Sequence, residues 1–166
     1  MELQIKSNYI GMTNADLITF CNQAVADWNY AVQNGSNLNF SFSRVYSTSQ
    51  STINFWGEYQ PAQSWYGKAV MYRYNEPTDP ELLDEIRLGQ VPYDYADCLL
   101  NVYHLDANYV TTTRAHWREI AAHEMGHALG LAHTTNKGTL MYHNFRESTA
   151  IGPTADEVVG VDSLYG

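Results

Sequence analysis

The sequence predicts an α+β fold within a single domain. Three observations lead to this prediction: one long segment near the N-terminus has the apolar spacing of a helix, several short segments rich in β-branched and aromatic residues follow it, and two more helical segments come last. This order is typical of helices packed against a sheet that is mixed or mainly antiparallel. A length of 166 residues fits one domain with one hydrophobic core.

The first two elements are a short strand and a long helix. Apolar and polar residues alternate over Leu3–Ser7, which predicts a strand. A helix is predicted from Thr13 or Asn14, either of which is a suitable N-cap, to about Gln33. Its apolar residues recur at helical spacing and form one stripe: Leu17, Phe20, Cys21, Ala24, Val25 and Trp28.

The middle of the chain predicts four strands. The first three, over Leu38–Tyr46, Thr52–Tyr59 and Lys68–Tyr74, are rich in β-branched or aromatic residues and are bounded by Gly, Pro, Ser or Asn. The fourth is predicted over Cys98–Leu105. We expect these strands to form the sheet against which the helices pack.

A long connection, residues 75–97, separates the last two of these strands. It contains three prolines and seven acidic residues, and a loop of this length is uncommon in a compact domain unless it is functional or organised by a ligand. Carboxylate oxygens are the ligands that Ca²⁺ prefers, so the loop fits either a calcium site or a solvated acidic loop. The seven acids are Glu76, Asp79, Glu81, Asp84, Glu85, Asp94 and Asp97.

Two helices are predicted towards the C-terminus. The first covers about Ala115–Leu129, and the second covers about Thr154–Leu164 after a proline, with Thr154 as a candidate N-cap. Asp156 and Glu157 lie in the first turn of the second helix, where the helix dipole favours acidic side chains.

The charge balance and the lack of long apolar runs exclude several classes of protein. With 18 acidic and 9 basic residues, the net charge is −9. This argues against binding to nucleic acids and to anionic membranes, since both need a basic surface. No apolar run approaches the ~20 residues of a membrane-spanning helix, and the first residues lack the order of a signal peptide. Two cysteines, Cys21 and Cys98, fit either one bridge or two buried thiols.

One short segment carries residues with metal-binding chemistry. From residue 123 to residue 133 the sequence reads HEMGHALGLAH. His123 and His127 are four residues apart and therefore lie on one helix face, where two imidazole nitrogens can share one Zn²⁺ at ~2.0–2.1 Å. Glu124 lies beside them without having to be a ligand, which suits a general base that activates water.

A third histidine ligand depends on Gly130. On a straight helix His133 would point about 80° away from His123. Glycine adopts positive φ at little cost, so the chain can turn at Gly130 and bring His133 back towards the same metal. Three protein ligands leave one position open for water, which is typical of a catalytic zinc site.

These eleven residues resemble the extended zinc-binding signature of metzincin metallopeptidases, HExxHxxGxxH. Met141 follows His133 by eight residues within the sequence GTLMY, which resembles the Met-turn of that group, a bend beneath the metal. The short spacing is similar to that of matrixins, the matrix metalloproteinase group. Residues 156–166 also resemble the final helix of a matrixin catalytic domain.

The resemblance implies a zincin-like fold for the whole chain, 1–166. It implies an N-terminal subdomain of about 1–120, with the sheet, the long helix and the active-site helix, and a small C-terminal subdomain of about 131–166, with the Met-turn and the last helix. The sheet would be twisted, mixed and mostly parallel, with an antiparallel edge strand. Three helices would accompany the sheet.

The resemblance also implies where a substrate would lie. An extended peptide would pair with the edge strand at about residues 68–74, and the segment after the Met-turn, 142–145, would form the wall of the main specificity pocket. The residues expected to contact substrate are Val70, Tyr72, Tyr142, His143 and Phe145. Matrixins usually have a proline where this chain has His143, so that residue fits both a role at the reacting oxygen and an ordinary loop position.

Animal matrixins usually hold a second, structural zinc through three histidines and an aspartate that precede the active-site helix. Residues 75–103 of this chain contain no histidine. We therefore expect one catalytic zinc and no structural zinc of that kind, with calcium as a further option.

These observations predict a zinc-dependent endopeptidase that hydrolyses peptide bonds in extended protein substrates. One Zn²⁺ would be held by His123, His127 and His133, and Glu124 would take a proton from the attacking water. The expected partner is a protein or peptide substrate, with no nucleic acid and no membrane, and the domain is expected to be a monomer. The resemblance favours a secreted, extracellular protein, with which a Cys21–Cys98 bridge would agree.

Two alternatives have specific counter-arguments. The first is a zinc-containing binding or toxin-like module without peptidase activity, which the presence of Glu124 disfavours because a structural site gains nothing from that base. The second is a metzincin of another branch, such as an astacin-like enzyme. The short gap to Met141 and the lack of a tyrosine two residues later disfavour it.

Overall fold

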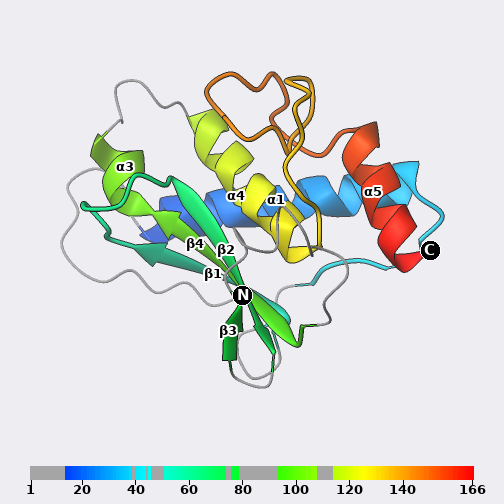
Figure 1. Cartoon of the computed structure of the whole chain (residues 1–166), viewed down its shortest axis with the longest axis horizontal. Coiled ribbons are helices and arrows are strands. Elements are labelled where there is room, and N and C mark those ends of the chain that lie inside the picture. The colour runs from blue at the N-terminus through cyan, green and yellow to red at the C-terminus, as the bar shows by residue number, and fades with distance from the viewer. Residues whose placement is uncertain are drawn as a thin grey trace.

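The computed structural model describes residues 14–38, 40–43, 45, 51–73, 76–78, 93–107 and 114–166 of the chain. Among the described residues one long helix comes first, strands follow, and three helices come last, which confirms the α+β class (Figure 1). The elements are α1 (Asn14–Gly35), β1 (Ile53–Glu58), β2 (Gly67–Arg73), β3 (Glu76–Thr78), β4 (Tyr95–Asn101), α3 (Val102–Ala107), α4 (Arg114–Ala128) and α5 (Ala155–Tyr165).

The described strands form one mixed sheet in the order β1-β4-β2-β3. β1 and β4 are parallel, with Ile53 opposite Ala96, whereas β2 runs antiparallel to both β4 and β3. The mixed character was expected, but antiparallel pairing within the described residues is not confined to one edge strand. The reason is that β3 begins directly after β2 and folds back on it, with Glu76 opposite Arg73.

The predicted strand over Leu38–Tyr46 does not form in the residues that the structure describes there, 38, 40–43 and 45. The backbone of Phe42 pairs instead with a side chain of α1. Its N–H group donates to Asn29 Oδ1 at 2.7 Å, and Asn29 Nδ2 donates to its carbonyl at 2.9 Å. An asparagine thus satisfies the groups that a neighbouring strand would satisfy. The predicted strand Leu3–Ser7 lies outside the described residues.

The predicted strand Cys98–Leu105 is wrong in its second half, because the chain changes from β4 to α3 after Asn101. The buried side chain of Asn101 accepts a hydrogen bond from the Tyr103 N–H at 3.3 Å, as an N-cap does. Its Nδ2 donates to the carbonyls of Gln60 and Trp65. Asn101 therefore both ends the strand and holds the segment that precedes β2.

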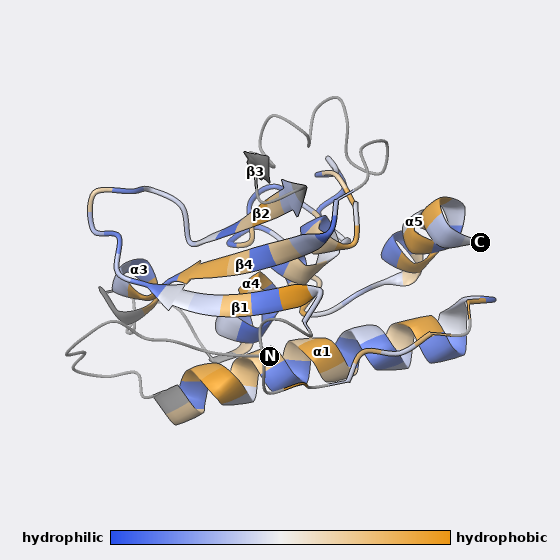
Figure 2. Ribbon diagram, turned by 90° about the horizontal axis from the view of Figure 1, so that it is seen from below, coloured by the Kyte–Doolittle hydropathy of each residue, from blue (hydrophilic) through white to orange (hydrophobic). Residues whose placement is uncertain are grey.

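The core lies between the two long helices and the sheet. Trp28 of α1 is fully buried, and its indole N–H donates to the Ala122 carbonyl of α4 at 2.9 Å. Figure 2 shows hydrophobic and hydrophilic segments alternating along α1, as the predicted apolar stripe requires. α4 packs on its other side against β2 and β4. α4 is therefore enclosed on two sides, by α1 and by the sheet.

The two cysteines are free thiols in the core, Cys21 on α1 and Cys98 on β4. Burial raises the pKa of each thiol well above its ordinary value. Of the two interpretations, the structure therefore has separate buried thiols rather than a bridge. None of the described helices combines the length and the apolar composition that crossing a membrane requires.

Candidate metal centre

Two of the histidines are oriented by hydrogen bonds to backbone carbonyls. His123 Nδ1 donates to the Leu140 carbonyl at 2.8 Å, and His127 Nδ1 donates to the Leu131 carbonyl at 2.8 Å. A proton on Nδ1 leaves Nε2 of the same ring with a free lone pair, which is the form that binds a metal. Helix α4 therefore presents two nitrogen atoms that are ready to bind a metal. Both residues are buried, with 9% of the surface of His123 and 4% of that of His127 exposed.

Gly130 ends α4 and turns the chain, as predicted. Its φ is +89°, in the left-handed region that glycine tolerates. The Gly130 N–H donates to the His127 carbonyl at 2.8 Å, and the Leu131 N–H donates to the Gly126 carbonyl at 3.0 Å. This pair of bonds is a Schellman motif. It directs the following residues back along the helix, so that His133 returns to the other two histidines.

The three imidazoles converge with the geometry that zinc needs. His133 Nε2 lies 3.1 Å from Nε2 of both His123 and His127. Zinc–nitrogen bonds of ~2.0–2.1 Å in a tetrahedron place two ligand nitrogens about 3.3 Å apart. Burial, followed by the charges of His127 and then His133, lowers the pKa of His123 well below its ordinary value, so its ring is neutral. Three converging imidazole nitrogens, each with a lone pair when its ring is neutral, are a donor set that fits a metal cation.

No other group of three or more His, Cys, Asp or Glu side chains within the described part of the chain has a suitable arrangement for a metal ion. The predicted calcium site falls mainly on acids of residues 76–85, whose side chains lie outside the description. Of the remaining two acids in that connection, Asp97 accepts a hydrogen bond from Asn54 Nδ2 at 2.8 Å. Calcium binding by this loop stays a prediction.

Glu124 lies beside the histidines and against the first residue of β2. The side chain is 6% exposed. A Cβ atom added to Gly67 would come within 2.4 Å of Glu124 Oε1, so a residue with a side chain at position 67 would displace the carboxylate. The absence of a side chain at Gly67 thus allows α4 to bring Glu124 against the backbone of the sheet edge.

A cavity of about 510 Å³ opens in front of Glu124, His123 and His133. Four parts of the chain line it: residues 64–67 before and at the start of β2, Ile120, His123 and Glu124 of α4, His133 after the turn at Gly130, and the segment 143–146. A substrate carbonyl placed at the three histidines would therefore have its neighbouring side chains inside this cavity.

The predicted substrate contacts are only partly brought together. His143 and Phe145 line the cavity, whereas Val70, Tyr72 and Tyr142 do not. Tyr72 lies opposite Pro77 of β3 and stacks on Tyr95, with ring centres 4.6 Å apart. β3 thus covers the second half of β2. Among the described strands, the part of β2 that remains open for a peptide is Gly67–Val70.

Met141 lies beneath the metal-binding part of α4. It is 1% exposed, and a Cβ atom on Gly126 would come within 2.4 Å of its sulfur. Its carbonyl accepts the Thr134 N–H at 2.8 Å, and its N–H donates to Glu157 Oε1 at 3.1 Å. Glu157 Oε2 also accepts the Thr154 N–H at 2.8 Å, so one buried carboxylate joins the start of α5 to this turn.

The cavity residues that were not predicted include Ile120, Tyr66, Gly67 and Arg146. Ile120 had an available signal, because it lies three residues before His123 and therefore on the same helix face. The other three had none, since they reach the cavity through a loop and through the distant segment after Met141.

Glu119 is a buried carboxylic acid one turn before His123. It is 3% exposed, and its Oε1 atom has no hydrogen-bond partner among the described residues. Burial raises the pKa of this carboxyl group to about 7, against a smaller opposite effect of a hydrogen bond from Ser148. The group is therefore protonated over part of the neutral range.

We expect Glu119→Gln to make the fold more stable than the wild type at alkaline pH and to leave its stability unchanged at acidic pH. An unfolded glutamate ionises near pH 4.3, whereas the native carboxyl group has a pKa of about 7. The wild-type protein should therefore lose stability as the pH rises between these values, and the loss should stay constant above them. A shift of this size in the pKa corresponds to at most about 4 kcal/mol of stability.

The free energy of unfolding of both proteins, measured by denaturant titration from pH 5 to pH 8.5, tests this. Because glutamine has the same shape without the charge, the variant should gain on the wild type steadily up to about pH 7. A constant difference between the two proteins over that range would contradict a buried, raised-pKa carboxyl group at Glu119.

The comparisons with known proteins agree with this geometry. A model of a peptidase family, described as Matrixin, matches residues 3–166. The plant protein Metalloendoproteinase 2-MMP of Arabidopsis thaliana is 29% identical over 134 residues, which cover 78% of this chain and 32% of that protein. Human Neutrophil collagenase is 43% identical over 68 residues, 38% of this chain and 15% of that protein. Rat Stromelysin-2 is 50% identical over 50 residues, 28% of this chain and 10% of that protein. The chain thus spans about a third or less of these relatives' lengths.

Proposed function

Because this chain belongs to the matrixin family of metallopeptidases, we propose that it is a zinc-dependent endopeptidase that uses Glu124 as its general base. Membership in the family implies a zinc peptidase that acts on proteins. The assignment of His123, His127 and His133 as ligands, and of Glu124 as the base, is specific to this chain.

The observation that carries the proposal is the convergence of three Nε2 atoms. Nε2 of His133 lies 3.1 Å from Nε2 of His123 and 3.1 Å from Nε2 of His127. Two of the rings are held in the metal-binding tautomer by the Leu140 and Leu131 carbonyls. A zinc ion bound there would supply Lewis acidity, which polarises a carbonyl and lowers the pKa of a bound water to about 7.

The chain's own residues would move the protons. Glu124 lines the cavity next to His123, so its carboxylate is placed to accept a proton from the attacking water and to pass it to the amine that leaves. The open edge of β2, Gly67–Val70, is placed to pair with an extended peptide by strand addition. Residues 143–146 would form the wall that receives a substrate side chain.

Met141 is proposed to act as the Met-turn of this chain. Its side chain supports α4 from below at Gly126, and its backbone is held by Thr134 and Glu157. Such contacts would keep the two parts of the chain that supply ligands, α4 and the segment with His133, in a fixed relation. We also propose that the protein acts outside the cell as a monomer.

An internally quenched peptide of generic sequence tests the proposed function. The zinc-loaded protein should cleave it at an internal bond, a chelator should stop cleavage, and one equivalent of Zn²⁺ should restore it while Mg²⁺ should not, because magnesium prefers oxygen ligands. Binding of zinc without any cleavage of peptides or denatured proteins would instead indicate a zinc-containing binding module. Cleavage that continues in chelator would contradict the zinc assignment.

A further inference from the structure

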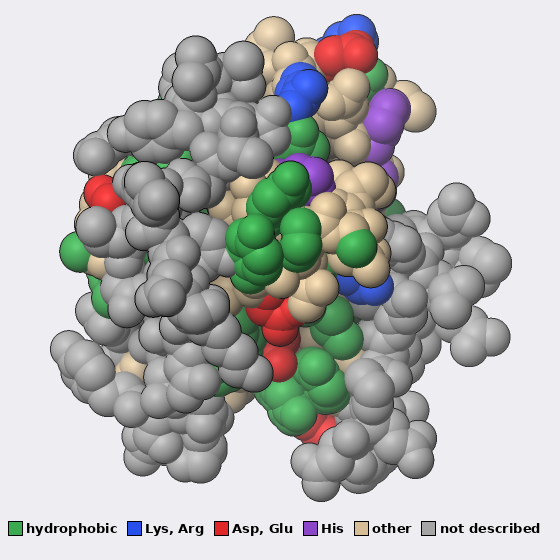
Figure 3. Space-filling model, turned by 90° about the vertical axis from the view of Figure 1, so that its left-hand side faces the viewer, with side chains coloured by type: hydrophobic (Ala, Val, Ile, Leu, Met, Phe, Trp, Pro, Cys, Tyr) green, Lys and Arg blue, Asp and Glu red, His purple; other side chains and the backbone are tan. Residues whose placement is uncertain are grey.

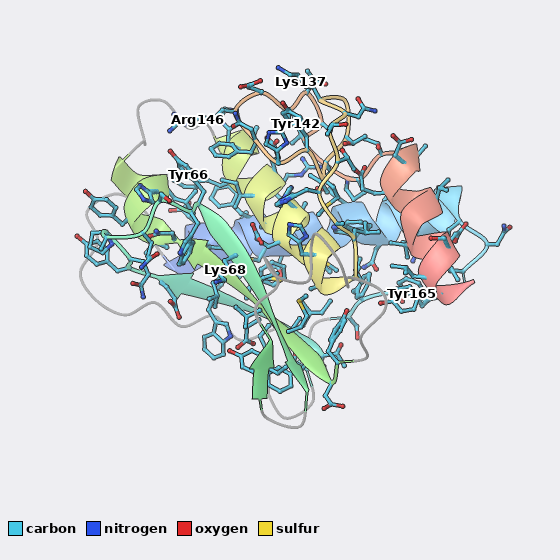
Figure 4. All side chains as sticks on the ribbon, in the orientation of Figure 1. Tyr66, Lys68, Lys137, Tyr142, Arg146 and Tyr165 are labelled. Atoms are coloured by element: carbon cyan, nitrogen blue, oxygen red, sulfur yellow. The ribbon has the colours of Figure 1, made fainter. Side chains whose placement is uncertain are left out.

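Arg146 lies at the exposed edge of the cavity and is held there by aromatic side chains. Its guanidinium donates a hydrogen bond to the Tyr66 hydroxyl. It also lies 5.2 Å from the centre of the Tyr66 ring and 5.9 Å from the centre of the Phe145 ring. All three side chains line the same cavity as Glu124 and His123. Figure 4 shows Tyr66 and Arg146 side by side near the first half of α4.

Tyr66 and Arg146 come from opposite sides of the cavity. Tyr66 precedes β2, whereas Arg146 follows the turn at Met141, and 80 positions separate the two residues. The rings of Tyr66 and Phe145 pack edge to face with centres 4.7 Å apart. The guanidinium is thus positioned before any ligand binds, and a positioned arginine loses less conformational freedom on binding than a mobile one.

The acidic side chain next to Arg146 in the sequence is occupied elsewhere. Glu147, the next residue, pairs with Lys137 and accepts a hydrogen bond from Asn144 at 3.0 Å. No ion pair within the described residues involves Arg146. Figure 3 shows histidine and basic side chains in the upper half of one face, with an acidic side chain beside the uppermost basic one and other acidic side chains below.

The charge of the cavity is therefore uneven. Among the described residues that line the cavity, Glu124 is the one acidic residue, and it lies against Gly67 next to the histidines. Arg146 adds a positive charge at the exposed edge. In a chain with 9 basic and 18 acidic residues, an arginine at the substrate cavity without a described carboxylate partner is suited to a carboxylate from outside the chain.

We propose that Arg146, positioned by Tyr66, is a specificity-determining residue that binds an acidic side chain of the peptide substrate close to the scissile bond. The inference rests on the proposed peptidase function and names its substrate class, peptides with Glu or Asp beside the cleaved bond. The guanidinium offers N–H donors to a carboxylate while it stays beside the Tyr66 ring and its hydroxyl. The Tyr66 hydroxyl supplies a third donor to the same anion.

Matched peptides test the proposal with the zinc-loaded full chain. In one internally quenched sequence, each of the three positions on either side of the cleaved bond is varied in turn as Glu, Gln, Lys or Leu. At one position the Glu peptide should have a kcat/KM about tenfold above that of its Gln isostere, as expected for one charged hydrogen-bonded contact. The Lys peptide should be the poorest substrate there.

Variants then assign the preference to its residues. Arg146→Gln should remove the preference for Glu, Arg146→Glu should reverse it in favour of Lys, and Tyr66→Phe should weaken it by about two- to threefold because only a hydroxyl is lost. In each variant the Leu peptide should lose less of its kcat/KM than the Glu peptide, because leucine has no carboxylate to lose, and this difference separates the charged contact from a general loss of binding or catalysis. Lys137→Ala is the matched control, since Lys137 is a nearby cation outside the cavity lining.

A binding measurement gives the same information without turnover. The Glu124→Ala variant should bind the uncleaved Glu peptide about tenfold more tightly than the Gln peptide, and the double variant with Arg146→Gln should bind both equally. Equal cleavage of Glu and Gln peptides by the wild type at every position, or a preference that persists in Arg146→Gln, would overturn the proposal. If no peptide of any sequence were cleaved, the proposed function itself would fail, which is a distinguishable result.

Discussion

Replacing Glu124 with alanine should lower kcat/KM for peptide cleavage by about 10²- to 10⁴-fold, the contribution typical of a positioned general base. Zinc content should stay at one ion per chain, because the ligand atoms all belong to histidines. Glu124→Gln should lose nearly as much activity, since an amide keeps the shape of the side chain but cannot accept the proton. The measurements are peptide hydrolysis and elemental analysis of the same samples.

The matched control is Glu119→Gln, because Glu119 is the other buried glutamate in the same part of α4. Its carboxyl group has a raised pKa of about 7, so a pH profile of the wild-type enzyme alone would not tell the two glutamates apart. Glu119→Gln should keep its activity on uncharged peptides. Full cleavage by Glu124→Ala would contradict the assignment of Glu124 as the base. A large loss of cleavage activity in Glu119→Gln would instead assign that role to Glu119.

The metal centre was largely predictable because its determinants are local. Two histidines four residues apart must share a helix face. Positive φ at Gly130 was expected from its residue type, and the Schellman bonds of the Gly130 and Leu131 N–H groups confirm the turn. The hydrogen bonds that fix the ring tautomers were not predictable, since the Leu140 carbonyl reaches His123 from a segment 17 positions away.

The fold was predictable where propensity and packing agree. The apolar stripe of α1 and the β-branched and aromatic residues of β1 predicted a helix and a strand, and both elements lie within two residues of the predicted bounds. The two wrong strands share a different cause, an asparagine side chain that replaces backbone pairing. Asn29 holds Phe42 from 13 positions away, and Asn101 begins a helix in a segment rich in strand-forming residues.

The cavity was the least predictable part because it is made by contacts between distant segments. Arg146 follows the Met141 turn in an unremarkable surface sequence, and only the fold shows that Tyr66 lies across from it. The small space between β2 and α4 at Gly67 likewise depends on how close the helix approaches the sheet. Sequence patterns report one element at a time, so substrate specificity is harder to predict than the metal site.

His133→Ala should lower zinc affinity by more than about 100-fold and abolish cleavage. Loss of an outer partner of a zinc ligand typically costs about 10- to 100-fold in affinity, and loss of the ligand itself removes a direct metal bond. His133 is the exposed member of the triad, so its removal leaves no cavity in the core. The zinc-free forms of the variant and the wild type should therefore unfold at similar temperatures, whereas added zinc should stabilise only the wild type.

His143→Ala separates ligation from mere proximity. His143 is also exposed and lines the same cavity, but it lies outside the group of three converging nitrogens. The variant should keep one zinc per chain and the zinc-dependent rise in melting temperature, because none of the three ligands is changed. If His143→Ala lost zinc and His133→Ala kept it, the third ligand would come from the segment after Met141 and not from the turn at Gly130. The conformation of Gly130 would then have no role in metal binding.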